Sequence, residues 1–277
     1  MRFSVGIEAV RPRATGWHGE CSGSFVSAAP VQTRHPETRI MTYNTHGCVG
    51  TDGALDIARI AKVIARHSPD IVTLQEIDLN RGRSGHRDQA RELARELGMD
   101  AYFTCAVRER EGEGQYGIAL LTAHGVEIVT EGCLPGRIDE VRAAQWARLL
   151  VHGVSVEIIH SHLSVHFIDR HAQLKALLGK EWLAEMLNHP HLIVCGDLNA
   201  TPFSPVYRAL RRHLADVQRS NAGPRRATWP SRLPFLRLDH VFVGRGFGVK
   251  RTFVPRDALT VLASDHLPLI ADLTIDA

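Results

Sequence analysis

Short apolar runs that end in polar residues form the main pattern of the chain after residue 38. The run at residues 192–195 passes through Gly196 and leads directly to Asp197 and Asn199. A continuous apolar run of this length is typical of a buried strand, and residues two apart on an extended chain point to the same side. The pattern therefore predicts a core strand that presents a carboxylate and an amide to one target, although Asp and Asn also end many strands because they suit turns.

Similar runs along the chain predict more strands than helices. Strands are predicted at residues 39–44, 70–76, 101–105, 116–122, 126–130, 145–151, 154–161, 192–199, 238–243 and 249–254, with a final strand after the turn at 264–268. Helical spacing predicts helices at about 53–67, 88–97, 168–187 and 205–213, the first capped by Asp52 and the second closed by Gly98. We therefore expect an α/β (α+β) fold in which helices flank packed sheets.

The domain organisation follows from where this pattern begins. No linker or internal repeat interrupts the chain after residue 38, so we expect one domain at residues 39–277. Residues 1–38 lack periodicity and are rich in Gly, Ser, Pro, Thr and Arg, which predicts a flexible leader. Glu8 interrupts its only apolar start, which argues against a secretory signal. No apolar run approaches the roughly 20 residues that cross a bilayer.

The cysteines predict a reducing compartment. Their number, five, is odd, none belongs to a CxxC pair, and Cys195 lies in a predicted core strand. Reduced thiols of this kind are typical of the cytoplasm. We therefore expect a cytoplasmic protein without a cysteine-based zinc site. We also expect a monomer.

The positive charge of the chain is concentrated in one segment. Residues 205–256 carry twelve Lys and Arg against two acids, a local net charge of +10, so the remainder carries −7 of the total of +3. A solvated mixed surface is the ordinary explanation of a charged run. Because this segment adjoins the strand that ends at Asp197, we favour a face that meets an anion, either nucleic acid or acidic lipid.

Polar residues at the ends of separate predicted strands form the candidate site. Strands end on Asn44, Glu76, His162 and Asp197 with Asn199, Asp239 begins another strand, and Asp265 and His266 occupy the turn before the last one. Ligands gather at strand ends in sheets that helices cover, so we expect these side chains to meet. Chance places a polar residue after one strand more readily than after four.

These residue types suit phosphoester hydrolysis. Glu76 with Asp265 or Asp197 offers the hard oxygen ligands that Mg²⁺ or Mn²⁺ prefers, and Asn44 adds a neutral oxygen or fixes a metal-bound water. A histidine beside an acid stays protonated and stabilises charge on a phosphoryl oxygen. The sequence contains no GxxxxGK(S/T), GxSxG or HExxH motif, which argues against P-loop, serine-hydrolase and zinc-protease chemistry.

Seven motifs carry a family resemblance. They are MTYNTHG, IVTLQEID, YGIALLT, IIHSHLS, VCGDLNATP, LDHVFV and SDHLPLIADL, within residues 39–275. Together they resemble the endonuclease/exonuclease/phosphatase superfamily, which includes pancreatic deoxyribonuclease, abasic-site endonucleases, neutral sphingomyelinases and inositol polyphosphate phosphatases. The pairing of GDLN with a downstream SDH is specific to it. The resemblance implies a four-layer sandwich of two packed mixed β-sheets flanked by helices, and a divalent-metal phosphoesterase.

The resemblance also implies a metal site. Glu76 matches the main metal ligand, Asn44 supports it, and Asp265 matches a metal-side acid. The chain departs from the abasic-site enzymes at His46, where they carry a second acid. Extra metal coordination and close kinship with that DNA-repair branch are therefore disfavoured.

The catalytic residues are implied in the same way. Asp197 matches the residue that positions or deprotonates the attacking water, and Asn199 matches a phosphate contact. His266, oriented by Asp239, matches the histidine that stabilises the phosphate or transfers a proton. His162 matches a histidine near the leaving group, where it also contacts the substrate.

The substrate stays open between two classes. Tyr116 is implied as a phosphate contact, whereas Ala123 follows its strand where many members have Arg. Residues 226–232 resemble a bacterial branch linked to phospholipid metabolism. We therefore expect a phosphodiesterase that acts on a phospholipid headgroup, with peripheral association with anionic membranes, or on nucleic acid as an endonuclease or exonuclease. A non-catalytic module that binds anionic lipid or nucleic acid is the alternative from another class.

Overall fold

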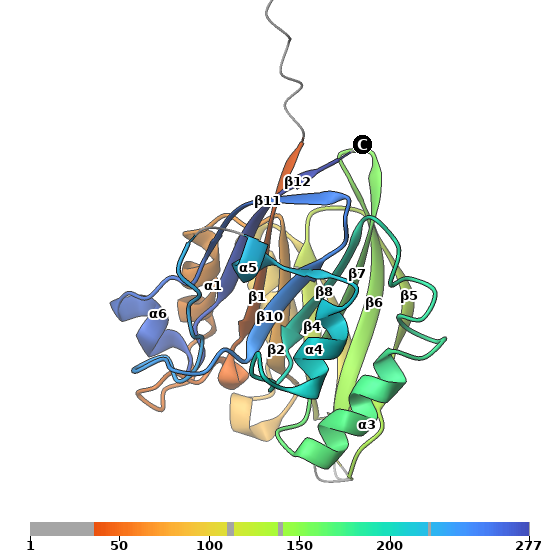
Figure 1. Cartoon of the computed structure of the whole chain (residues 1–277). Coiled ribbons are helices and arrows are strands. Elements are labelled where there is room, and N and C mark those ends of the chain that lie inside the picture. Colours follow the sequence, from red (N-terminus) through yellow and green to blue (C-terminus); the bar gives the residue numbers. More distant parts are fainter. Residues whose placement is uncertain (1–35, 110–113, 138–140, 221–222, 277) are drawn as a thin grey trace, which may run out of the picture. The chain divides into compact units, whose positions relative to one another are not determined.

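Two six-stranded sheets form the frame of the computed structural model, which describes residues 36–109, 114–137, 141–220 and 223–276 (Figure 1). The first sheet has the order β11-β12-β1-β2-β4-β3 and the second the order β5-β6-β7-β8-β10-β9. The first comprises β1 (Glu37–Asn44), β2 (Ile71–Leu79), β3 (Asp100–Arg108), β4 (Gln115–Thr122), β11 (Phe247–Phe253) and β12 (Leu269–Ile275). The second comprises β5 (Val126–Leu134), β6 (Arg142–Val151), β7 (Val154–His162), β8 (Leu192–Asp197), β9 (Ala215–Asp216) and β10 (Asp239–Val243). Both sheets are mixed, with β1–β2 and β7–β8 parallel and the other pairs antiparallel.

The helices lie on the outer faces of the two sheets. They are α1 (Ile57–Ala65), α2 (Gln89–Leu97), α3 (Phe167–Leu177), α4 (Pro205–Arg211), α5 (Val217–Ser220) and α6 (Ala258–Ala263), with the 3₁₀ turns η1 (His46–Cys48) and η2 (Gly82–Ser84). Figure 1 shows α1 and α6 beside the first sheet, and α3 and α4 over the second.

Alternating side chains on the strands divide the core into three layers. Ile40 of β1 packs between the sheets, whereas its neighbour Met41 packs against α1 and α2. In β8, Ile193 likewise lies between the sheets and Val194 packs under α3 and α4. Successive side chains of a strand point to opposite faces, so strands buried on both faces read as continuous apolar runs. The predicted four-layer sandwich is confirmed.

Two of the predicted helices have different boundaries. The helix predicted from residue 53 begins at Ile57, because Asp56 caps it by accepting the Arg59 N–H. Asp52 accepts from the Ala54 N–H and the Arg59 guanidinium instead. The helix predicted to reach residue 187 ends at Leu177, and residues 180–187 form turns.

The remaining differences concern the end of the shortened helix, a helix that was not predicted, and the start of the first strand. Gly179 follows the shortened helix, and a glycine disfavours helix continuation by about 1 kcal/mol. Helix α6 was not predicted at all, although Asp257 and Thr260 form a capping box at its start. Strand β1 begins at Glu37, two residues before the predicted strand, and residues 1–35 of the predicted leader lie outside the described residues.

The strand register brings the predicted polar strand ends together. His162 of β7 is opposite Asp197 of β8, and Asp197 is opposite Asp239 of β10. In the first sheet, Asn44 ends β1 beside β2. A hydrogen bond from Asn44 to Asp197 joins these two groups, so the site lies where strands of both sheets converge.

Candidate active site

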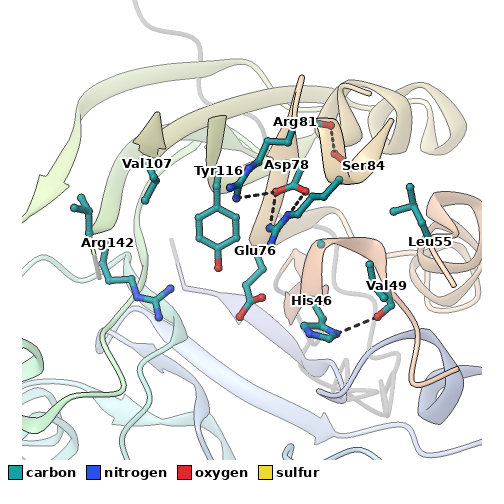
Figure 2. A pocket seen from close by; sticks show the side chains of 13 residues that line it. His46, Val49, Leu55, Glu76, Asp78, Arg81, Ser84, Val107, Tyr116 and Arg142 are labelled. Carbon is teal, nitrogen blue, oxygen red and sulfur yellow. Dashed lines mark hydrogen bonds and ion pairs between the residues drawn. The ribbon is translucent and has the colours of Figure 1, made fainter. Parts of the chain in front are cut away.

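Glu76 owes its direction to an irregularity in β2. The strand continues to Leu79, so the prediction that it ends at Glu76 is wrong. The pairing of β2 with β4 shifts register between Gln75 and Ile77, and Glu76 has a φ of +60°. A bulge of this kind re-aims a side chain. Figure 2 shows the half-buried Glu76 carboxylate in open space among Tyr116, Arg142 and His46.

Asn44 connects this carboxylate to the second sheet. Its Nδ2 donates to Oε1 of Glu76 at 3.0 Å and to Oδ2 of Asp197 at 3.0 Å. Its Oδ1 accepts the backbone N–H of His46, also at 3.0 Å. The buried Asn44 amide therefore lies between the carboxylates of Glu76 and Asp197 and bonds to both.

Gly196 is required for the position of Asp197. Its φ is +132°, and a Cβ there would lie 1.9 Å from the carbonyl oxygen of Ser161. Only glycine enters this backbone region readily. The chain then turns so that Oδ1 of Asp197 accepts the Asn199 N–H at 2.9 Å, leaving Asp197 1% exposed. Burial and the charge of Asp239 raise the pKa of Asp197, against the opposing effects of His266 and Asn44.

His266 is held as a cation by buried acids. Its Nδ1 donates to Oδ2 of Asp239 at 2.9 Å, and its Nε2 lies 3.6 Å from Oδ2 of Asp197. Burial lowers the pKa of His266, but the charges of Asp239 and Asp197 outweigh burial and raise the pKa to about 10. Ser264 accepts the His266 N–H and donates to the backbone oxygen of Asn44, which fixes the turn. His266 is therefore an imidazolium at neutral pH.

His162 has the opposite charge state. Its Nε2 also lies 3.6 Å from Oδ2 of Asp197. Burial, Arg142 and His266 lower its pKa well below the ordinary value, so this contact is not an ion pair. The Arg142 Nη1 lies 3.2 Å from its Nδ1, and the Asn199 Nδ2 lies 3.3 Å from its Nε2. Because a neutral imidazole has one acceptor nitrogen, only one of these two groups donates to the ring in a given tautomer.

A hollow of about 450 Å³ opens over these groups, and we call it the catalytic hollow. Its lining comprises Glu76, Arg142, His162, Val165, Arg170, Asp197, Asn199, Thr201, Trp229, Leu236, Leu238, Asp265 and His266. Asn44 and Asp239 bond to the lining residues from behind it. Asp265 accepts the Trp229 indole N–H at 3.2 Å.

The predicted site residues are thus largely brought together. Tyr116 is the exception, because it lines an adjoining cavity on the other side of Glu76. Arg142 was missed although it contacts His162, and no strand-end signal marks it because it begins β6. Arg170 and Gln173 of α3 brace the segment after His162, because Arg170 donates to the oxygens of Ser164 and Val165 and Gln173 accepts the Ser164 N–H.

Two sets of the described residues offer metal ligands. Asp197, Asp239 and His266 place ligand atoms within 4.8 Å of one another. In that set Asp239 and His266 are already bonded to each other, and a metal would have to displace a proton from His266. Glu76 fits better, since its Oε2 has no partner among the described residues and Asp265 lines the same hollow. Carboxylate oxygens with room for water match what Mg²⁺ and Mn²⁺ require.

Comparison with known proteins identifies the family and agrees with the fold. The model of the "Endonuclease/Exonuclease/phosphatase family" matches residues 41–266. No curated protein matches the chain. Among solved structures, a Bacteroides vulgatus endonuclease/exonuclease/phosphatase is 19% identical to this chain, with a TM-score of 0.69. The match covers 87% of this chain and 100% of that one. The human Nocturnin catalytic domain with bound sulfate is 24% identical, with a TM-score of 0.65, and the match covers 88% of this chain and 95% of that one. A mannosyl-6-phosphatase of Bacteroides thetaiotaomicron is 19% identical, with a TM-score of 0.66, and the match covers 86% of this chain and 100% of that one.

Proposed function

We propose a function from one premise, which is that the chain belongs to the endonuclease/exonuclease/phosphatase family. The function is hydrolysis of a phosphodiester that depends on Mg²⁺ or Mn²⁺. The bridge from Glu76 through Asn44 to Asp197 carries the proposal. It holds the Glu76 carboxylate, which is suited to bind a cation, close to the Asp197 carboxylate. Asp197 faces the same hollow and is suited to bind a water molecule.

Glu76 and Asp265 are the proposed cation ligands, with Asn44 beside them. A divalent cation bound there supplies charge stabilisation at the phosphoryl oxygens. Because Asn44 donates to Oε1 of Glu76, it directs Oε2, which has no partner in the described part of the chain, towards the hollow. The amide thereby fixes the ligand carboxylate in one orientation.

The other side chains act on the substrate and on water. Asp197 accepts a hydrogen bond from the attacking water and orients it towards phosphorus. The His266 imidazolium, held by Asp239, donates to a phosphoryl oxygen that gains charge. Asn199 contacts the phosphate, and His162 faces the departing ester oxygen.

Hydrolysis of bis-p-nitrophenyl phosphate tests this function. We expect turnover with Mg²⁺, loss of turnover in EDTA, and loss of turnover in His266→Asn while the variant remains folded, as checked by its melting curve. His86→Asn is the matched control, because His86 is exposed and lies outside the catalytic hollow. Full activity of His266→Asn, or no Mg²⁺-dependent turnover by wild type, contradicts the proposal and favours the non-catalytic binding module.

An apolar rim around the catalytic hollow favours a phospholipid substrate. Six large apolar side chains within three residues of a lining residue in sequence are each more than half exposed, and they are Val165, Phe167, Ile168, Phe203, Leu233 and Phe235. Val165 lines the hollow, Phe203 follows the lining residue Thr201, and Phe235 packs on Trp229 of the lining. Exposed apolar groups concentrated at one site mark an interaction surface. Peripheral binding to an anionic membrane also suits the exposed Arg225, Arg226 and Arg232 nearby in sequence.

Vesicle sedimentation tests whether the substrate is a phospholipid or a nucleic acid. We expect wild type to sediment with phosphatidylglycerol vesicles and Phe203→Ser/Phe235→Ser to stay in solution while still hydrolysing bis-p-nitrophenyl phosphate. Leu150→Ser is the control, because Leu150 is 63% exposed but lies near the opposite end of β6. Plasmid cleavage with steep salt dependence and no vesicle binding would favour a DNA endonuclease or exonuclease.

The proposal places the protein in the cytoplasm as a monomer. The four described cysteines are free thiols, and Cys48 and Cys195 are buried, which fits a reducing compartment. No helix among the described residues is long and apolar enough to span a membrane. Gel filtration with light scattering tests the monomer.

A further inference from the structure

We propose that a cavity next to the catalytic hollow binds a second anionic group of the substrate, a phosphate or a carboxylate. We call it the arginine cavity and define it by Glu76, Asp78, Arg81, Arg83, Tyr116 and Arg142. The inference deepens the proposed function and rests on it for the position of the reacting phosphate. It assigns a substrate with two anionic groups.

The arginine cavity begins where the catalytic hollow ends. Its volume is about 480 Å³, and it shares Glu76 and Arg142 with the hollow. Figure 2 shows the Tyr116 hydroxyl and the Arg142 guanidinium pointing towards the Glu76 carboxylate from the far wall. A substrate whose reacting phosphate lies in the hollow therefore extends past Glu76 into this cavity.

A buried carboxylate fixes the arginines in place. Asp78 is 1% exposed and binds Arg83 through two contacts of 2.8 Å, from Nε to Oδ2 and from Nη2 to Oδ1. Arg81 lies 3.7 Å from the same carboxylate and bonds to Glu109 at 2.7 Å. A two-pronged pair holds a guanidinium in one orientation, so little side-chain entropy is lost when a ligand binds.

The backbone under these residues is braced as well. The Asp78 N–H donates to Oε1 of Gln89 at 2.8 Å, and Nε2 of Gln89 donates to the Gly47 oxygen at 2.7 Å. Gln89 is fully buried at the start of α2. These bonds tie β2, α2 and η1 together behind the cavity, which makes its wall a preformed one.

The charges of the arginine cavity favour an anion. The carboxylates at this wall are bonded already, Asp78 to Arg83, Glu109 to Arg81 and Glu76 to Asn44. The Arg83 side chain is 56% exposed, and its Nη1 has no hydrogen-bond partner in the described part of the chain. A cation on Glu76 would add further positive charge. A planar guanidinium with free N–H groups binds phosphate or carboxylate directionally.

Neutralisation of Asp78 alone accounts for only part of this arrangement. Arg83 satisfies both oxygens of Asp78 by itself. Arg81 nevertheless lies next to it, and the two guanidinium carbons are 5.8 and 5.5 Å from the centre of the Tyr116 ring. Because the guanidiniums occupy the space over this ring, the cavity suits an anion better than a stacked base.

Calorimetric titration with non-hydrolysable phosphonates tests the inference without turnover. The probes are propylphosphonate, 3-phosphonopropanoate and propane-1,3-bisphosphonate, with the five-carbon analogues of each to vary the reach. Titrations are made in Mg²⁺ at fixed free concentration. We expect one or both two-anion probes to bind wild type about tenfold more tightly than the one-anion probe of equal length. The tighter of the two identifies the second group as carboxylate or phosphate.

Two variants show whether the arginine cavity causes the preference. Asp78→Asn/Arg83→Gln removes the guanidinium together with its buried partner, so no uncompensated charge is left, and the preference should fall below about twofold. Arg83→Lys keeps the charge but loses the fork, and it should retain part of the preference. Arg87→Gln is the matched control, because Arg87 pairs with Glu92 outside the cavity.

Some results of these titrations would overturn the inference, and others would separate it from the proposed function. Equal affinity of wild type for one-anion and two-anion probes at both lengths, or no binding of any probe, overturns the inference. A preference that survives in folded Asp78→Asn/Arg83→Gln, checked by its melting curve, overturns it too. Hydrolysis of bis-p-nitrophenyl phosphate without the preference leaves the proposed function intact, whereas the preference without hydrolysis leaves the arginine cavity intact.

Discussion

The catalytic hollow and the arginine cavity share two wall residues but are built in different ways. The hollow takes Asp197, His162 and His266 from strand ends and a turn of the core, all buried and linked to one another. The arginine cavity takes Arg81 and Arg83 from the η2 segment after β2, and the Arg83 side chain is 56% exposed. The hollow therefore has groups with perturbed pKa values, and the cavity has fixed charges.

This difference separates the proposed chemistry from the proposed selection of substrate. Buried groups have pKa values that their neighbours shift, downwards for His162 and upwards for His266. Guanidinium groups need no such burial, because they stay charged at any physiological pH. Changes in the hollow should therefore affect kcat, and changes in the arginine cavity should affect substrate affinity.

The largest expected effect comes from Asp197→Asn. The amide cannot accept a proton from the attacking water, so we expect kcat for bis-p-nitrophenyl phosphate to fall by about a thousandfold. Asp100→Asn, an exposed aspartate at the start of β3, serves as the control. Wild-type kcat in Asp197→Asn would remove the hollow from the chemistry.

Glu76→Gln should affect both regions, because Glu76 belongs to both walls. At a hundredfold excess over its dissociation constant, a cation stabilises the folded state by about 2.7 kcal/mol, which raises Tm by about 5 to 10 °C at this size. We expect Mg²⁺ to produce this shift in wild type and not in Glu76→Gln, measured by differential scanning fluorimetry. An equal shift in both proteins would place the cation elsewhere.

Tyr116→Phe should have a smaller effect, confined to affinity. Its hydroxyl faces Glu76 and Arg142 (Figure 2), and one hydrogen bond to a charged group amounts to about 1.5 kcal/mol. We expect KM for a two-anion substrate to rise about tenfold while kcat stays within about twofold. A loss in kcat alone would assign Tyr116 to the hollow.

Asp216→Asn should leave turnover at 25 °C unchanged, because Asp216 contacts neither region. It pairs with the buried Arg237 at 2.9 Å and accepts from Tyr207. Burial raises the pKa of Asp216, but Arg237 and Tyr207 outweigh it and lower the pKa below its ordinary value. Breaking this pair should cost about 3 kcal/mol of unfolding free energy.

The pH dependence of that loss has a definite sign. A carboxyl group with a lowered folded-state pKa stabilises the protein above its unfolded pKa of about 3.9, and the stabilisation disappears as the pH falls through the folded value. The stability difference between wild type and Asp216→Asn should therefore be full above about pH 5 and shrink below about pH 4, measured by urea denaturation. A constant difference would contradict the ion pair.

Much of the fold was predictable because local patterns specify strands and caps. The hairpin of β6 and β7 turns at His152 and Gly153 as expected, and Asp88 and Gly98 bound α2. The prediction that helix α3 reaches residue 187 is wrong, because the apolar spacing continues past Gly179 although the backbone turns there. Trp182 and Leu183 pack into the core from those turns, not from a helix.

Part of the site was predictable for the same reason. Asn44, Asp197 and Asp239 bound strands in the sequence and in the structure. Arg83 and Arg142 gave no signal, because a single arginine beside a strand is ordinary. Their significance depends on the buried Asp78 and on His162, which lie respectively five and twenty positions away in sequence.

The sequence by itself determined which residue types end the strands, and with them the family and the class of chemistry. Only the tertiary structure decided that a bulge turns Glu76 into the hollow, that Asn44 meets Asp197 across the two sheets, and that His266 is charged while His162 is neutral. The reason is physical. Strand and cap patterns arise from neighbours along the chain, whereas orientation and charge state depend on which distant groups exclude water from one another.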